Sequence, residues 1–156
     1  MVRMGGAKGQ GRNCQLENNR CDMEFVTNPT DEHLVAVERG LDDYNAGLAS
    51  TRFTIPVRAV FVDSGRVMAG IVGTAYWGKI HIRILWVHPD YQSRGLGSRL
   101  VDWVAERGRE LRCTAALVDT MSFQAPEFYE RRGYRRFGVS QGYEGGASRH
   151  YFEKEL

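Results

Sequence analysis

Residues 85–100 read LWVHPDYQSRGLGSRL. The first of them end an apolar stretch that is typical of a strand, and the last begin a segment whose apolar side chains recur at helical spacing. Between the two lies QSRGLGS, residues 92–98. The first turn of a helix presents unpaired N–H groups and the positive end of the helix dipole. Gly95 and Gly97 let the backbone approach a bound group closely, and Gln92 and Arg94 add donors, so the junction is predicted to hold a phosphate.

Other glycine-rich junctions fit this stretch less well. A Walker loop needs Gly-Lys followed by Ser or Thr, which is missing here. A dinucleotide-binding fingerprint needs a third glycine where Leu100 stands, and it belongs to a parallel unit, whereas antiparallel strands are expected before this junction. A helix cap whose glycines serve only tight packing remains an alternative for the seven residues taken alone.

The segments before the junction predict an antiparallel meander. Residues 55–63 and 66–77 are apolar strand-like runs, joined by Ser64-Gly65 in the manner of a tight hairpin. Gly78-Lys79 makes a second tight turn into the strand at 80–87.

The other segments add helices and further strands. Upstream, a short strand is expected at 23–27 and a helix within 28–47. Downstream, periodicity and composition predict a helix at 95–111, a buried strand at 114–120, a helix at 125–132 ended by Gly133, and two last strands around the Gly-rich loop 142–146. The order gives an α+β, or mixed α/β, fold with six or seven mostly antiparallel strands flanked by helices.

Length and composition indicate one domain. The chain has 156 residues with a net charge of +2, of which 42% are hydrophobic and 26% charged. Residues 1–22 are polar, Gly-rich and without periodicity, so a flexible arm or an expression-derived extension is expected there, followed by a single domain at 23–156.

Sequence and composition also predict the location and the partners of the protein. No apolar run approaches the ~20 residues needed to cross a bilayer, and no secretory signal is evident, so no membrane partner is expected. The three cysteines form no zinc-type pair, which predicts no metal and, by default, a cytoplasmic setting. A net charge of +2 is weak for a nucleic-acid binder. Four arginines near Gly133 leave that alternative open, although they could equally pair with a coenzyme phosphate or with acids: Arg131, Arg132, Arg135 and Arg136.

Two motifs together resemble the GNAT superfamily of N-acetyltransferases. QSRGLG matches its coenzyme motif, Gln/Arg-x-x-Gly-x-Gly/Ala, and APEFYERRGY at 125–134 is similar to its later helix, which carries Ala-x-x-Phe-Tyr before Gly-aromatic. The order of elements agrees as well, over roughly 23–156. The resemblance implies a sheet that is splayed in the middle and a site for acetyl-CoA as co-substrate in the gap between two strands.

The resemblance also assigns roles to residues. Residues 85–87 would hold the pantetheine arm and the acetyl carbonyl through their backbone, and the glycine-rich turn would hold the pyrophosphate. Ser122 stands where the family often has an Asn that contacts pantetheine, so that role carries over only loosely. The expected coenzyme-binding residues are Leu85, Trp86, Val87, Gln92, Ser93, Arg94, Gly95, Leu96, Gly97, Ser98, Ser122 and Phe128.

Two side chains are the expected catalytic groups. Tyr129 matches the tyrosine that the family uses to protonate the departing thiolate, although a core aromatic residue is the alternative. His81 stands where several members place a carboxylate base, and its ordinary pKa near 6.5 suits a general base at neutral pH. A half-exposed structural histidine is equally consistent with the sequence, and water ordered by Asp119 could replace His81 as the base.

The sequence gives the donor more directly than the acceptor. A small polar amine is expected, because the chain is compact and has no added recognition domain. Protein or peptide Nα or lysine acetylation, and a non-catalytic acyl-CoA sensor, remain alternatives. A homodimer through an exposed sheet edge or the last strands also stays open.

Overall fold

The computed structural model describes residues 24–48 and 54–156. Contacts within the chain divide it into two units, of which residues 40–156 are the larger. The expected arm at 1–22 lies outside the described residues, as do Cys14 and Cys21. Within the described ranges, no helix is both long and apolar enough to span a membrane.

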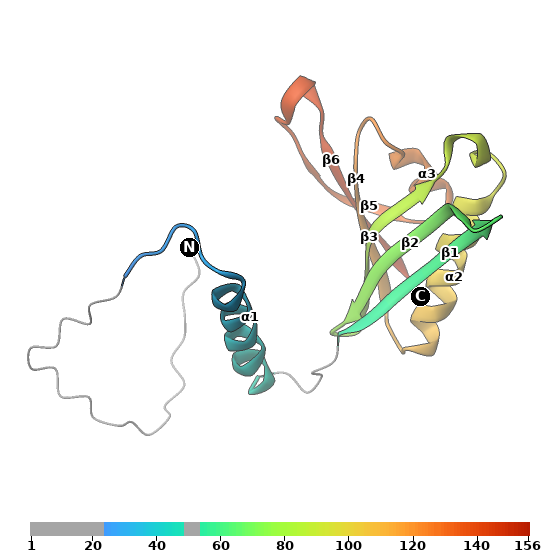
Figure 1. The fold of residues 1–156 in the computed structure, drawn as a ribbon. Coiled ribbons are helices and arrows are strands. Elements are labelled where there is room, and N and C mark those ends of the chain that lie inside the picture. Colours follow the sequence, from blue (N-terminus) through green and yellow to red (C-terminus); the bar gives the residue numbers. More distant parts are fainter. Residues whose placement is uncertain (1–23, 49–53) are drawn as a thin grey trace, which may run out of the picture. The chain divides into compact units, whose positions relative to one another are not determined.

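Six strands form one mixed sheet in the larger unit (Figure 1). Their order across the sheet is β1-β2-β3-β4-β6-β5, and all neighbouring pairs are antiparallel except β3 and β4. The strands are β1 (Ile55–Asp63), β2 (Arg66–Tyr76), β3 (Lys79–Val87), β4 (Ala115–Met121), β5 (Arg135–Ser140) and β6 (Arg149–Glu155). The predicted mixed, mostly antiparallel sheet is therefore confirmed.

The sheet opens at its one parallel pair. β3 and β4 are paired only from Lys79↔Ala115 to Ile82↔Val118, although β3 continues to Val87 and β4 to Met121. We call the point beyond the last pair the fork. Along its opposite edge, strand β3 stays paired with β2 up to Ala69↔Val87. The backbone of residues 83–87 that faces β4 is therefore left open for another partner.

A bulge shapes β3 at the same place. The register with β2 shifts between Val72↔Ile84 and Gly73↔Ile82, so Arg83 is an extra residue. Ile80 and Ile82 are buried, whereas Arg83 and Ile84 are both exposed, because the bulge interrupts the alternation of faces. A bulge bends a strand, which fits the parting of β3 from β4 here.

Gly73→Ala tests the packing under this bulge. A Cβ at Gly73 would lie 2.7 Å from the carbonyl oxygen of His81, so backbone has to shift. We expect the free energy of unfolding in urea to fall by about 1–3 kcal/mol. Gly40→Ala, where nothing lies within 4 Å of the added Cβ, is the control and should not destabilise. Equal stability of Gly73→Ala and the parent would contradict the close approach.

Two helices cover one face of the sheet. The apolar face of α2 (Leu96–Glu110) buries Leu100, Val101 and Val104 against the strands. The short α3 (Pro126–Arg131) places Tyr129 against Phe152 of β6, with ring centroids 6.0 Å apart. Cys113 lies buried between α2 and β4, as a small apolar residue would.

Two expectations about local structure were wrong. Residues 24–27 form no strand, because a strand needs a hydrogen-bonded partner and Phe25 is 90% exposed; Met23 lies outside the described residues. The helix that follows, α1 (Asp31–Ala46), was expected. The second hairpin turn is made by Trp77-Gly78 rather than Gly78-Lys79, since both have positive φ, 48° and 75°.

Candidate active site

The turn at residues 92–98 leaves the start of α2 open. Its N-cap is Gly95, which has no side chain that could cap the first N–H groups of the helix. Gly95 has φ of 79°, a conformation that L side chains rarely adopt, so a glycine is needed here for the path of the chain. The first N–H groups of α2 are therefore available to an anion.

A groove of about 1140 Å³ extends along this turn and includes the fork. We call it the phosphate-turn groove, after the role that the sequence predicts for this turn. All the residues expected to bind the coenzyme line it except Arg94 and Ser122: Leu85, Trp86, Val87, Gln92, Ser93, Gly95, Leu96, Gly97, Ser98 and Phe128.

Arg94 and Ser122 have other contacts. The guanidinium of Arg94 lies over the ring of Tyr91, 4.8 Å from its centroid. The hydroxyl of Ser122 accepts a hydrogen bond from the N–H of Ser148 at 3.1 Å, and the N–H of Ser122 donates to the carbonyl of Ser148 at 2.7 Å. Ser122 thus joins the end of β4 to the start of β6 instead of lining the groove.

Tyr129 lies on the wall of the phosphate-turn groove. It is 5% exposed and packs edge-on against both Phe128 and Tyr134. Burial, with a smaller contribution from the charge of Asp119, raises the pKa of Tyr129 to about 12. The phenol is therefore neutral near pH 7 and keeps a proton that it can donate in a hydrogen bond.

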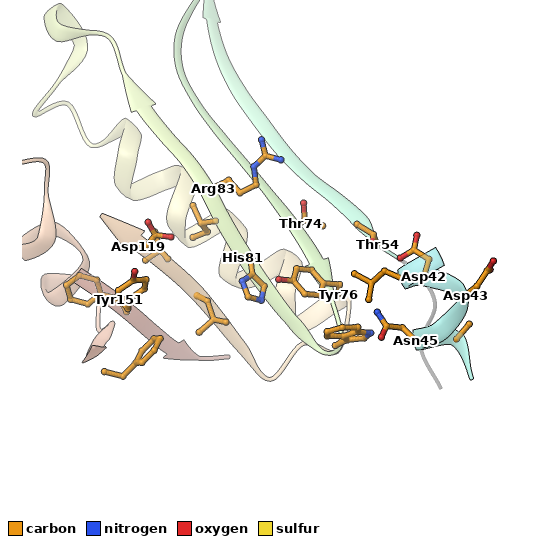
Figure 2. Close-up of a pocket in the computed structure, with 18 residues that line it drawn as sticks. Asp42, Asp43, Asn45, Thr54, Thr74, Tyr76, His81, Arg83, Asp119 and Tyr151 are labelled. Carbon is orange, nitrogen blue, oxygen red and sulfur yellow. The ribbon is translucent and has the colours of Figure 1, made fainter. Parts of the chain in front are cut away.

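A second hollow lies on the face of the sheet opposite to α2 and α3, and we call it the outer groove. Beside the turn residue Trp77, strand residues line this groove: Thr74, Tyr76, His81, Arg83, Leu117, Asp119, Phe137 and Tyr151. The ring of His81 stacks on that of Tyr76 at 4.4 Å (Figure 2). Burial and then the charge of Lys79 lower the pKa of His81 below 6.5, so the imidazole is neutral at pH 7 and can accept a proton.

The two grooves meet at the fork. Ile82 and Val118, the last paired residues of β3 and β4, line both grooves, and so do Arg83 and Asp119, the next residue of each strand. The two grooves therefore share part of their walls at the point where the two strands part. Such an arrangement suits the transfer of a group between two bound substrates.

Comparison with known proteins identifies the family. The model of the acetyltransferase (GNAT) family matches residues 20–134. The chain belongs to this family. It is thus a GNAT-type N-acetyltransferase, as the two motifs predicted.

Individual acetyltransferases are similar to this one. A blasticidin-S acetyltransferase of Streptomyces morookaense is 39% identical over 95 residues, which cover 60% of this chain and 70% of that protein. A Bacillus cereus acetyltransferase of known structure has a TM-score of 0.77 at 32% identity, over 85% of this chain and 98% of that one. A Bacillus anthracis acetyltransferase solved with acetyl coenzyme A has a TM-score of 0.59 at 17% identity, over 65% of this chain and 63% of that one.

The acetyltransferase has groove residues that sequence reasoning did not single out. Thr120 and Gln124 line the phosphate-turn groove, and their side-chain oxygens lie 3.0 Å apart. The amide oxygen of Gln124 also accepts from the N–H of Met121 at 2.9 Å, which fixes the turn between β4 and α3. A Gln just before Ala-Pro was a weak signal, because many polar residues occur in such turns.

The four arginines near Gly133 in this acetyltransferase are all paired with carboxylates. Arg131 and Arg132, which also line the phosphate-turn groove, pair with Glu127 and Asp102 at 3.5 and 3.3 Å. On β5 the partners are Glu153 for Arg135, at 3.5 Å, and Glu130 for Arg136, at 2.5 Å. This pairing reduces the basic surface that a nucleic acid would need.

Proposed function

We propose that this acetyltransferase moves the acetyl group of acetyl-CoA to a primary amine of a small polar molecule while both substrates are bound. One observation carries the proposal: a groove along the open start of α2 and a groove with a neutral histidine meet at the fork. The similarity to a blasticidin-S acetyltransferase supports a small-molecule acceptor.

The phosphate-turn groove is the place for acetyl-CoA. The N–H groups at the start of α2, with Gln92 and Ser93 nearby, would receive the pyrophosphate. Leu85, Trp86 and Val87 offer the open backbone of β3 to the pantetheine arm and the acetyl carbonyl. An N–H that points at this carbonyl also stabilises the oxyanion of the tetrahedral intermediate. The acetyl-CoA complex of a protein with the same fold supports acetyl-CoA as the co-substrate.

The acceptor must lose a proton before it attacks. An alkylamine with a pKa of ~10.4 is neutral in only about one part in 2,500 at pH 7. His81 in the outer groove is the proposed base: it takes the proton from the ammonium, and the neutral nitrogen then attacks the acetyl carbon. The nitrogen gives up a second proton as the bond between carbon and sulfur breaks, which balances the proton that the thiol of CoA gains. The products are then the acetylated amine and CoA.

Tyr129 is the proposed donor to the leaving sulfur. As the bond between carbon and sulfur breaks, its phenol donates a hydrogen bond to the developing thiolate. Full transfer from a phenol of pKa about 12 to a thiolate of pKa ~8.5 would be uphill by ~5 kcal/mol. Burial of the sulfur in the same groove raises the pKa of the thiol and narrows that gap.

The dependence of activity on pH tests the role of His81. Protonation of His81 should abolish turnover, so kcat/KM should rise with pH through an apparent pKa below 6.5. The positive charge of Lys79 disfavours the imidazolium, so Lys79→Gln should move this rise in kcat/KM, the acid limb of the profile, to higher pH. His81→Gln should remove the limb and lower kcat about a hundredfold or more. If Lys79→Gln left the apparent pKa of the rising part of the pH profile unchanged, His81 would not be the group that titrates there.

A screen of amine acceptors tests the proposed function. The release of CoA thiol from acetyl-CoA would be followed with blasticidin S, short diamines, aminoglycosides, lysine peptides and peptides with free N-termini. We expect a small molecule to have the highest kcat/KM. A peptide as the best acceptor would contradict a small-molecule substrate. Tight binding of acetyl-CoA without turnover of any amine would favour the sensor instead.

A further inference from the structure

Asp119 occupies a distinctive place in the fold. It follows the last paired residue of β4 at the fork and lines both grooves. Tyr129 lines the phosphate-turn groove as well, and the charge of Asp119 contributes to the raised pKa of its phenol. The amine must approach the thioester near that phenol. Asp119 is therefore a carboxylate that both grooves share at the fork.

Within residues 24–48 and 54–156, one neighbour holds the carboxylate of Asp119. Arg149, the first residue of β6, pairs with it, and its Nε donates to Oδ2 at 2.5 Å. The second contact from this guanidinium, through Nη2, goes to the same oxygen. Among the described residues, no hydrogen bond reaches the other oxygen, Oδ1. The side chain remains 36% exposed, so Oδ1 can accept a further donor.

At the fork, strands β3 and β4 carry side chains of opposite charge. On the β3 side Arg83 is positive, and on the β4 side Asp119 is negative. The open backbone of β3 is where the acetyl carbonyl is expected, and its oxygen becomes negative in the intermediate. A positive β3 side suits that oxygen, and a negative β4 side suits an incoming ammonium. Tyr151, opposite Asp119 on β6, adds an aromatic ring on the same face (Figure 2).

We propose that Asp119 binds the ammonium group of the acceptor at the fork through Oδ1, while Arg149 fixes its orientation through Oδ2. Asp119 is then a specificity-determining residue for cationic amines, and Arg149 is a positioning residue. The inference rests on the proposed function, because it takes the phosphate-turn groove as the site of CoA.

The test uses two CoA thioethers and needs no known acceptor. The aminopropyl thioether of CoA carries an ammonium just beyond the sulfur, and the hydroxypropyl thioether has a neutral group of the same length. We expect calorimetry at pH 7 to show that the parent binds the aminopropyl thioether about tenfold more tightly, as a charge-assisted hydrogen bond implies. Equal affinities for the two would overturn the inference.

Variants separate charge from structure. Asp119→Asn should abolish the preference and keep the affinity for plain CoA, whereas Asp119→Glu should restore part of the preference. Arg149→Met removes the link between β4 and β6 and leaves the carboxylate, so it should keep a preference. Loss of the preference in Arg149→Met to the same extent as in Asp119→Asn would mean that Asp119 serves only that link, which would overturn the inference.

Two controls complete the design. Glu106→Gln, on the exposed side of α2, removes the same amount of charge and should leave the preference intact. Failure of the parent to bind CoA itself would reject the proposed function. CoA binding without a preference for the ammonium rejects only the role of Asp119.

Discussion

Tyr129→Phe is expected to lower kcat about a hundredfold or more, while the Kd for acetyl-CoA changes by less than about threefold. The substitution keeps the ring that packs on Phe152 and removes only the hydroxyl. Without this donor the sulfur leaves as an unsupported thiolate in a buried groove, which is costly in the transition state but not in the ground state. Steady-state kinetics and calorimetric titration measure the two quantities.

Tyr134→Phe is the matched control for this prediction. Tyr134 is 3% exposed and contacts Tyr129 edge-on, with 5.6 Å between ring centroids. Its hydroxyl is buried and has no hydrogen-bond partner among the described residues, so its removal should leave kcat and stability unchanged or raise stability slightly. If Tyr129→Phe kept the kcat of the parent, the phenol would be a core residue only.

Gly97→Val has the second large expected effect. A Cβ at Gly97 would lie 3.6 Å from both Phe128 and Val87, so a methyl group at this position makes only ordinary contacts. The extra methyl groups would enter the phosphate-turn groove beside the start of α2 and push the pyrophosphate from its N–H donors. The loss of two such hydrogen bonds should raise the Kd for acetyl-CoA by about 10- to 100-fold.

Gly97→Ala provides the comparison. Its single methyl group makes only ordinary contacts, so we expect a smaller rise in Kd than for the valine variant. Urea unfolding of both variants separates a local effect from loss of the fold. An unchanged Kd in a folded Gly97→Val protein would show that the phosphate lies elsewhere.

The sequence predicted the elements of the larger unit well, because their patterns are local. Ser64-Gly65 marked its hairpin correctly, since both residues adopt the positive φ that such a turn needs. The second turn was misplaced by one residue, because Trp77 has no preference for the left-handed conformation that it adopts. The expected strand at 23–27 failed in its described part because strand formation depends on a distant partner that no local pattern reveals.

The candidate site was predicted less completely than the fold. The glycines and Gln92 could be found because they share one short motif with the family. The bulge at Arg83 and the meeting of the two grooves at Asp119 depend on the register between β2 and β3 and on where β3 leaves β4. The Asp119–Arg149 pair joins residues thirty positions apart, and the sequence contained no signal for it.

Calorimetric titration with acetyl-CoA, beside free CoA and NADH, tests the central claim most directly. The account predicts saturable binding of both CoA species with one site per chain, and no binding of NADH. Absence of CoA binding by the folded protein would contradict the claim, and QSRGLGS would then be only the cap of α2.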